Sequence, residues 1–291
     1  MENESTWLFL DDTFIKSSPS RGAKMTVQQE LKQQESIHHF VIRLGSKLKL
    51  DGRTILAATV YINRYYSRMP ITQSKYYVAT AAIAISCKLH DNYRQPDKIA
   101  LAGCNIKNPN QSRPLDEHSD IFWRWRDQLL FREELILKTI NFDLNIDLPY
   151  NIRDELLREA DNEFEDENSF FEKKPEIMKN TIALVEVLSS LPIFIAYDTY
   201  TIFGTALTII IYEANLKFTE EKLHLPEHYL EAKLQVDSGM CWQCYQYVLR
   251  LLKYAKSDPN LGSNEVAIKR IPNLSQSQFE AIANGKQLQG V

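Results

Sequence analysis

Two charged residues attached to apolar stretches are the residues of this chain best placed to do chemistry. Lys88 lies next to the end of the segment ATAAIAISCKL, and Glu133 lies within FREELILKTINFDL. Residues three or four positions apart share a helix face. By that spacing Glu133 shares its face with Phe122, Trp125, Leu129, Ile136 and Ile140. A charge on an apolar face needs a partner, so the two residues suggest a clamp for another protein.

Two structural alternatives account for the same residues. Lys88 would complement the negative end of its helix dipole. Glu133 would pair within the chain or lie at the edge of the apolar stripe. Spacing alone leaves these alternatives open.

Sequence motifs for catalysis are absent. The sequence contains no GxxxxGK[ST] or GxGxxG stretch for a nucleotide and no GxSxG or HExxH segment. The six histidines have no evident nucleophile beside them. The sequence therefore predicts a protein that is not an enzyme, with no catalytic residues and no cofactor.

Three weaker patterns have structural explanations. Cys241 and Cys244 form a CxxC, but a structural zinc site needs four ligands, and a βαβ context for a redox site is missing. We expect the two thiols to pack as small hydrophobes and expect no metal.

Trp123 and Trp125 alternate with arginines, which would suit base stacking, but Trp125 lies on the apolar stripe, so a helical core is favoured. The acidic run 154–176 predicts a solvated helix and linker, with a calcium or magnesium site as the alternative.

Composition favours a helical intracellular protein. The 291 residues include only 9 glycines and 11 prolines, against 44% hydrophobic and 25% charged residues. The net charge of −4 gives no footprint for sequence-independent binding to nucleic acid or a membrane. We also expect no secretory signal and no membrane span. Four cysteines fit a reducing compartment.

The apolar pattern divides the chain into two related halves. Prolines fall between stretches of helical periodicity, and SKYYVATAAIAISCKL and TYTIFGTALTIIIYEA are apolar on nearly every side. Each should be the buried central helix of a bundle, with Gly204 and Ala206 allowing close approach in the second. The halves meet near 147–149, and overlaying them places Glu213 opposite Lys88. Residues 104–119 are expected to be an exposed loop, and the tail after Tyr254 to be weakly ordered or docked by short contacts.

A series of segments follows in a recognisable order along the first half. Trp7 and Phe9 precede the segment Ser18-Pro19-Ser20-Arg21, and VIRLGSKLKL, TILAATVYINRYY, AIAISCK and EELILKTINFDL come after it. In this order the chain resembles a cyclin, specifically a transcriptional cyclin of the T/K type, with the early residues before the first cyclin box and the later segments within it. The resemblance covers residues 7–150 well and 150–255 more loosely, mainly through IFGTALTIIIYEANLKF.

The resemblance implies an all-α fold of two consecutive cyclin-box five-helix bundles, each around a buried central helix. The expected organisation is an N-terminal segment and helix at 1–35, the first box at 36–148, the second box at 149–255 and a polar tail at 256–291.

By resemblance, Lys88 and Glu133 hold the regulatory helix of a cyclin-dependent kinase. Tyr65, Leu89 and Ile136 would be exposed apolar groups around them. The family has two acidic residues at the second and third positions after the lysine, whereas this chain has His90 and Asp91, so Asp91 keeps part of that role. The Met-Arg and Trp pattern of the substrate-docking patch of cell-cycle cyclins is not found in QESIHHFVIRL.

The resemblance therefore predicts a nuclear regulatory subunit that binds and activates a cyclin-dependent kinase. RNA polymerase II C-terminal repeats and elongation factors would be substrates of the complex, with no direct binding to nucleic acid or membrane. The alternatives are a C-, L- or H-type transcriptional cyclin with another kinase, or a two-repeat general transcription factor that binds promoter DNA. The latter should carry a basic face and commonly a zinc ribbon. An enzyme with a metal at the CxxC or the acidic run comes last.

Overall fold

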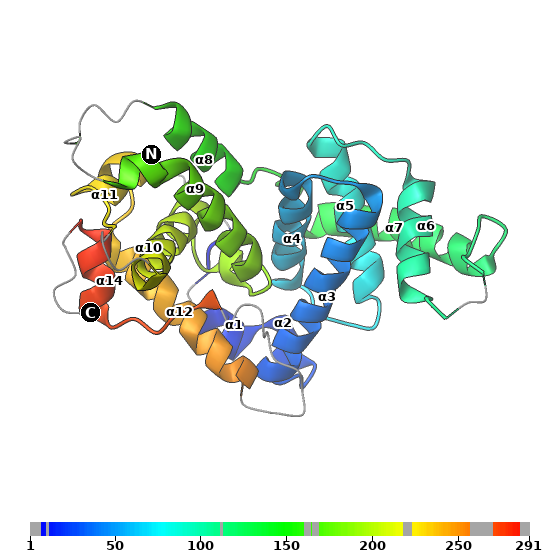
Figure 1. The fold of residues 1–291 in the computed structure, drawn as a ribbon. Helices are drawn as coiled ribbons and strands as arrows, with labels where there is room; N and C mark the ends of the chain where they lie inside the picture. Colours follow the sequence, from blue (N-terminus) through cyan, green and yellow to red (C-terminus); the bar gives the residue numbers. More distant parts are fainter. Residues whose placement is uncertain are drawn as a thin grey trace. The chain divides into compact units, whose positions relative to one another are not determined.

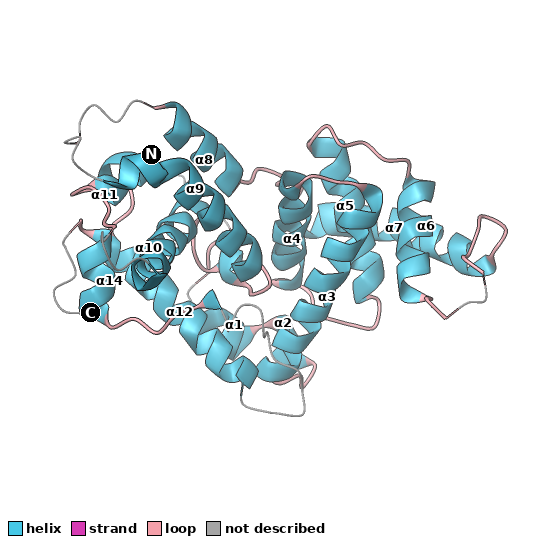
Figure 2. Cartoon of the chain, in the orientation of Figure 1, coloured by secondary structure: helices cyan, strands magenta, loops and turns pink. Residues whose placement is uncertain are grey.

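The computed structural model describes residues 7–9, 12–110, 113–159, 164, 169–217, 223–256 and 270–285 (Figure 1). Every regular element in these ranges is a helix (Figure 2), which confirms the all-α class. The chain divides into two compact units, Phe9–Ile146 and Asp147–Val291, the latter together with Met1–Leu8. None of the described helices combines the length and the apolar content that a membrane crossing requires.

The first unit is a bundle around α5. Its elements are α1 (Asp12–Ser17), α2 (Pro19–Gly22), α3 (Val27–Leu48), α4 (Gly52–Tyr66), α5 (Lys75–Leu89), α6 (Pro96–Lys107) and α7 (Asp120–Thr139). Helix α5 packs against α3, α4, α6 and α7, and every residue from Val78 to Cys87 is buried. A helix that is apolar on all sides needs neighbours on all sides, so α5 is the predicted central helix.

The second unit repeats this plan around α10. Its elements are α8 (Pro149–Arg158), α9 (Ser169–Leu188), the short 3₁₀ helix η1 (Ile193–Ile195), α10 (Thr199–Lys217), α11 (Tyr229–Leu234), α12 (Ser238–Lys256) and α14 (Gln276–Ala283). Helix α10 contacts α8, α9, α11, α12 and α14, and it is buried from Thr201 to Tyr212. A Cβ on Gly204 would lie 3.0 Å from Cys241 Sγ, so the predicted close approach is confirmed at this glycine.

The Ser18-Pro19-Ser20-Arg21 segment fastens the start of the first unit to α3. Ser18 Oγ donates to Glu30 Oε1 at 2.7 Å, and Arg21 Nη1 pairs with Glu30 Oε2 at 2.9 Å. The Ile71 amide donates to Ser20 Oγ at 3.1 Å, which ties the segment to the loop before α5. Burial raises the pKa of Glu30, opposed by hydrogen bonds from the serines and by the Arg21 charge.

Two local expectations are wrong. Pro175 lies inside α9 instead of between helices, so the chain continues through a residue that lacks the N–H for one helical hydrogen bond. Packing of α9 against α8 and α10 outweighs that local cost. The expected loop at 104–119 also begins too early, because α6 runs to Lys107 and buries Cys104 completely.

The expected boundary between the N-terminal segment and the first box, at residues 35 and 36, does not coincide with a helix end. It lies inside α3, whose buried residues continue from Leu31 through Leu44. The C-terminal region contains α14, which packs against α10 and α12. Tyr245 fixes its approach, since the phenol donates to Pro272 O at 2.7 Å and accepts from the Leu274 amide at 2.8 Å. Within the acidic run, residues 160–163 and 165–168 lie outside the described residues.

Candidate functional site

The site is built where the end of α5 lies beside α7. Lys88 is in the last turn of α5, and its ammonium donates to Glu133 Oε1 on α7. The structure therefore brings the two predicted residues together as an intramolecular ion pair, which was one of the alternatives for Glu133. The Lys88 side chain is 46% exposed and the Glu133 side chain 13%.

The ion pair leaves hydrogen-bonding capacity unused. An ammonium has three N–H donors, and a carboxylate has several acceptor positions on two oxygens. The exposed side of Lys88 can therefore bond a second group without breaking its bond to Glu133. The ion pair also restrains two flexible side chains, which lowers the entropy that a partner must remove on binding.

Exposed leucines flank the ion pair. Leu89 follows Lys88 and is 44% exposed, and Leu130 lies one turn before Glu133 and is also 44% exposed. Leu137, one turn after Glu133 on the same helix face, is half-buried. We call these five residues, Lys88, Leu89, Leu130, Glu133 and Leu137, the charged-pair surface.

The expectation that Tyr65 and Ile136 are exposed is wrong. Tyr65 is 3% exposed and Ile136 is fully buried. The Tyr65 ring packs edge-on against Tyr66 with centroids 5.1 Å apart, and burial raises the pKa of its phenol, while the nearby Arg132 lowers it. Both residues support the surface from the core, because α4 and α7 turn these positions into the interior of the bundle to which both helices belong.

The turn after α5 places Asp91 beside the surface. Asp91 is exposed, has a left-handed φ of 53°, and makes no ion pair within the described part of the chain. Asn92 anchors this turn to α4 through hydrogen bonds to Asp51 Oδ2 at 2.9 Å and Thr54 Oγ1 at 3.0 Å. Ser86 adds a bond to Thr54 O at 2.6 Å, so the end of α5 is fixed in position.

Leu130 and Leu137 were missed by the sequence reasoning, which followed the buried stripe through Leu129 and Ile136. The signal was present, since positions 130, 133 and 137 also follow the helical interval. Periodicity identifies residues that share a face, but two apolar faces on one helix look alike until the neighbouring helices are known.

The two cysteines of α12 and Trp125 belong to the packing. Cys241 and Cys244 are free and buried in α12, and burial raises the pKa of both thiols, that of Cys244 to about 12. Their predicted packing role is confirmed. Trp125 is 5% exposed and packs against Tyr77 with centroids 4.7 Å apart, whereas Trp123 is exposed. Among the described residues, no three His, Cys, Asp or Glu side chains are grouped to hold a metal ion.

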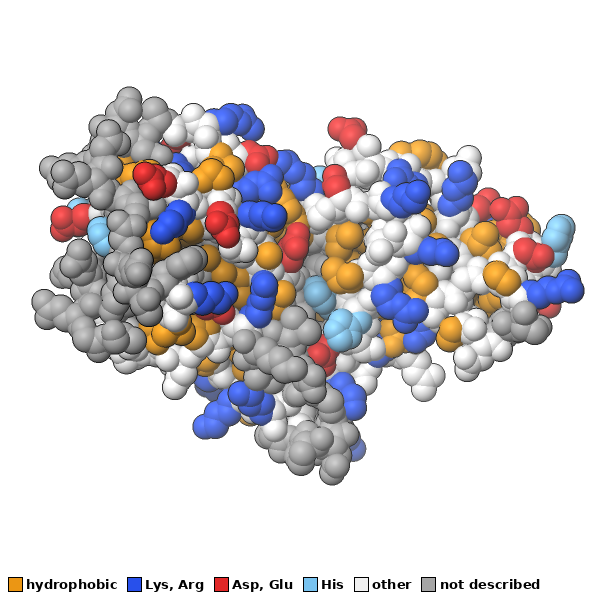
Figure 3. Space-filling view, in the orientation of Figure 1, with side chains coloured by type: hydrophobic (Ala, Val, Ile, Leu, Met, Phe, Trp, Pro, Cys, Tyr) orange, Lys and Arg blue, Asp and Glu red, His pale blue; other side chains and the backbone are white. Residues whose placement is uncertain are grey.

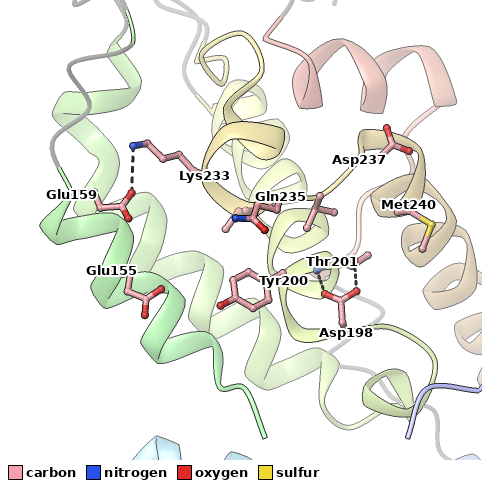
Figure 4. Close-up of a pocket in the computed structure, with 11 residues that line it drawn as sticks. Glu155, Glu159, Asp198, Tyr200, Thr201, Lys233, Gln235, Asp237 and Met240 are labelled. Atoms are coloured by element: carbon pink, nitrogen blue, oxygen red, sulfur yellow. Dashed lines mark hydrogen bonds and ion pairs between the residues drawn. The ribbon is translucent and has the colours of Figure 1, made fainter. Parts of the chain in front are cut away.

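A separate cavity of about 700 Å³ lies in the second unit, between α8, the start of α10 and the α11–α12 connection (Figure 4). Four of its polar residues have structural roles. Asp198 accepts hydrogen bonds from the Thr201 amide at 2.9 Å and hydroxyl at 2.6 Å, and Lys233 pairs with Glu159 at 3.3 Å. The arrangement stabilises the start of α10 and joins α11 to α8.

The family match to known proteins covers the first unit. Residues 7–145 match the family described as cyclin, N-terminal domain. Cyclin pch1 of Schizosaccharomyces pombe is 30% identical over 150 residues, which are 51% of this chain and 44% of that protein. Cyclin-T1 of Mus musculus is 27% identical over 149 residues, covering 51% of this chain and 20% of that protein. The chain thus spans less than half the length of these relatives.

A likeness in structure extends into the second unit. A chain of the yeast RNA Pol II CTD kinase CTDK-1 complex superposes with a TM-score of 0.55 at 14% identity, covering 96% of this chain and 93% of that one. At this low identity the likeness shows a shared fold alone. Residues 7–145 thus match a cyclin N-terminal domain, and cyclins of the T type are among the proteins to which the chain is similar.

Proposed function

We propose that this chain is a non-catalytic regulatory subunit that binds and activates a cyclin-dependent kinase in the nucleus. The substrates of the complex would be the C-terminal repeats of RNA polymerase II and elongation factors. The charged-pair surface is the observation that carries this proposal, because it combines an exposed charge, a restrained partner and flanking leucines. The cyclin relatives support the choice of kinase class.

The mechanism is allosteric. The leucines would form the desolvated centre of the interface, and the Lys88–Glu133 ion pair would set the register of the docked kinase helix. A kinase is active when its own lysine–glutamate pair is assembled around the ATP phosphates. Binding activates the kinase only by the difference in affinity between its active and inactive arrangements. This chain supplies that binding energy and needs no reacting group.

A charge swap separates this role from a purely structural one. In Lys88→Glu/Glu133→Lys the intramolecular ion pair is kept, but each charge presented to a partner is reversed. The matched control is Glu134→Lys/Lys138→Glu, which swaps an exposed ion pair on α7 itself. Each tagged full chain is recovered from nuclear extract, bound kinase is identified by mass spectrometry, and phosphorylation of a polymerase-repeat peptide is measured.

We expect wild type and the control swap to recover a cyclin-dependent kinase and its activity, and the Lys88/Glu133 swap to lose both while keeping the wild-type circular dichroism spectrum. Equal kinase recovery by the folded Lys88/Glu133 swap would show that the pair is only structural. Recovery of promoter DNA without any kinase would favour the general transcription factor alternative.

A further inference from the structure

A groove in the first unit lies apart from the charged-pair surface. It runs between the end of α3, helix α6 and the loop that follows α6, and it encloses about 550 Å³. Its apolar lining includes Leu48, Leu101 and Leu115, and its cations are Lys47, Lys98 and Arg113. We call it the α3–α6 groove. Figure 3 shows Lys and Arg side chains beside hydrophobic ones over α3 and α6.

Hydrogen bonds hold the walls of this groove in place. The Asn105 side chain on α6 forms two hydrogen bonds with the backbone of Leu115 in the loop. It donates to the Leu115 carbonyl at 3.0 Å and accepts from the Leu115 amide at 2.8 Å. Arg94 caps the end of α3 by donating to the carbonyls of Leu48 at 3.1 Å and Lys49 at 3.2 Å. A groove with fixed walls loses little entropy when it is filled.

The charges of the groove are unbalanced. No carboxylate lines it, and Lys47, Lys98 and Arg113 form no ion pair within the described ranges. The neighbouring Asp97 is held by Arg126 at 2.6 Å. Because the whole chain has a net charge of −4, this local excess of cations does not follow from the composition. The three cations come from three different segments, so the fold assembles them around the apolar floor.

We propose that the α3–α6 groove binds an acidic peptide segment of a partner protein, with an aliphatic side chain on the floor and flanking carboxylates on the three cations. Pockets of roughly 300–1,000 Å³ with an apolar lining and a few polar groups are typical ligand sites. An apolar floor favours a peptide over nucleic acid, because affinity for nucleic acid comes mainly from lysines and arginines that neutralise phosphates. This site goes beyond the proposed kinase activation and does not depend on it.

The test is a titration of the full chain with a rhodamine-labelled peptide in which leucines are flanked by aspartate and glutamate, followed by fluorescence anisotropy. A second peptide carries Asn and Gln in place of the acids, and a labelled uridine oligonucleotide represents nucleic acid. The variant is Lys47→Glu/Lys98→Glu. The matched control is Lys32→Glu/Lys253→Glu, which makes the same change of net charge at exposed positions outside the groove.

We expect the acidic peptide to bind wild type and the control equally, and to bind the groove variant at least about tenfold more weakly, which corresponds to 1.4 kcal/mol. The amide peptide should bind weakly, and added salt should reduce the affinity of the acidic peptide because the cations are exposed. The groove variant should keep the kinase recovery of wild type.

Equal loss of binding in the control and the groove variant would reduce the effect to net charge and overturn the proposal. Absence of binding to wild type would overturn it as well. Tighter binding of the oligonucleotide than of the acidic peptide, lost in the groove variant, would assign the groove to nucleic acid instead.

Discussion

At the scale of single residues, neighbouring positions on one helix have different tasks. Glu133 has a partner in Lys88, Leu130 is exposed beside it, and Ile136 is fully buried three positions later. Surface ion pairs typically contribute about 0–1 kcal/mol to stability. Lys88, which is 46% exposed, therefore adds little to the stability of the fold, and its charge is available to a partner, whereas the Glu133 carboxylate is 13% exposed and is paired by Lys88.

Leu130 and Ile136 should separate binding from stability. Leu130→Ala is expected to change the free energy of unfolding by no more than about 0.5 kcal/mol, because the side chain is exposed. It should weaken kinase recovery, since the leucine flanks the ion pair. Ile136→Ala should cost about 2–5 kcal/mol of stability, because it leaves a cavity in the core. Urea unfolding measures both, and a reversed order of the two stabilities would contradict the assignment.

His90 should make stability depend on pH. Burial lowers the pKa of His90 below its ordinary value of 6.5, with smaller effects from Asp51 and Asp91, which raise it, and Arg53, which lowers it. As the pH falls below 6.5, the unfolded state binds a proton that the folded state does not yet bind, so stability decreases. His90→Gln should reduce the loss of thermal stability between pH 7 and pH 5. An unchanged pH slope in the variant would show that His90 does not contribute.

At the scale of elements, the central helices depend on close contacts that small residues allow. Helix α5 is surrounded by α3, α4, α6 and α7. Helix α10 is surrounded by α8, α9, α11, α12 and α14. Gly103 shows the same principle on α6, since a Cβ there would lie 2.9 Å from the Trp125 ring. Tight approach gives a dense core, and it makes these positions intolerant of an added methyl group.

Gly204→Ala should therefore destabilise the second unit. Alanine has a better helix propensity than glycine by about 1 kcal/mol, but its Cβ would lie 3.0 Å from Cys241 Sγ in a packed interface. Overpacking typically costs about 1–3 kcal/mol, so the expected net loss of stability is up to about 2 kcal/mol. Gly22→Ala is the control, because nothing lies within 4 Å of its Cβ position. Differential scanning calorimetry measures both, and a stabilised Gly204→Ala variant would contradict the close packing.

At the scale of the whole molecule, each unit has its own buried central helix and its own core. The family match lies in the first half, whereas the structural likeness extends over 96% of the chain. The likeness in fold therefore includes the second unit, which the family match does not reach. The C-terminal helix α14 belongs to the second unit, where its Phe279 is fully buried.

Phe279 should determine whether α14 stays docked. Its ring stacks on Tyr245 with centroids 5.3 Å apart and contacts Trp242 at 5.4 Å. Phe279→Ala should cost about 3–5 kcal/mol in the stability of this region. Hydrogen exchange of the α14 amides should then accelerate, whereas Gln276→Ala, at an exposed position of the same helix, should leave it unchanged. Equal exchange in both variants would mean that α14 is held by other contacts.

Much of the architecture follows from the sequence. Apolar residues on all sides of two segments predict two buried central helices, and Asp147-Leu148-Pro149 marks the change from one unit to the other, as the structure shows. These features are local or periodic, so they can be read without knowing which elements meet. Pro175 is an exception, because long-range packing outweighs the local preference of proline.

Exposure was decided only by the tertiary structure. The sequence placed Lys88 and Glu133 on apolar helices, but their mutual bond joins residues 45 positions apart. Ile136 and Leu130 are both apolar residues of α7, and only the packing of α4 and α5 against α7 buries the first and leaves the second in solvent. Likewise, Lys47, Lys98 and Arg113 meet only because α3, α6 and the following loop fold together. Periodicity states which residues share a face, and the neighbouring elements determine whether that face is covered.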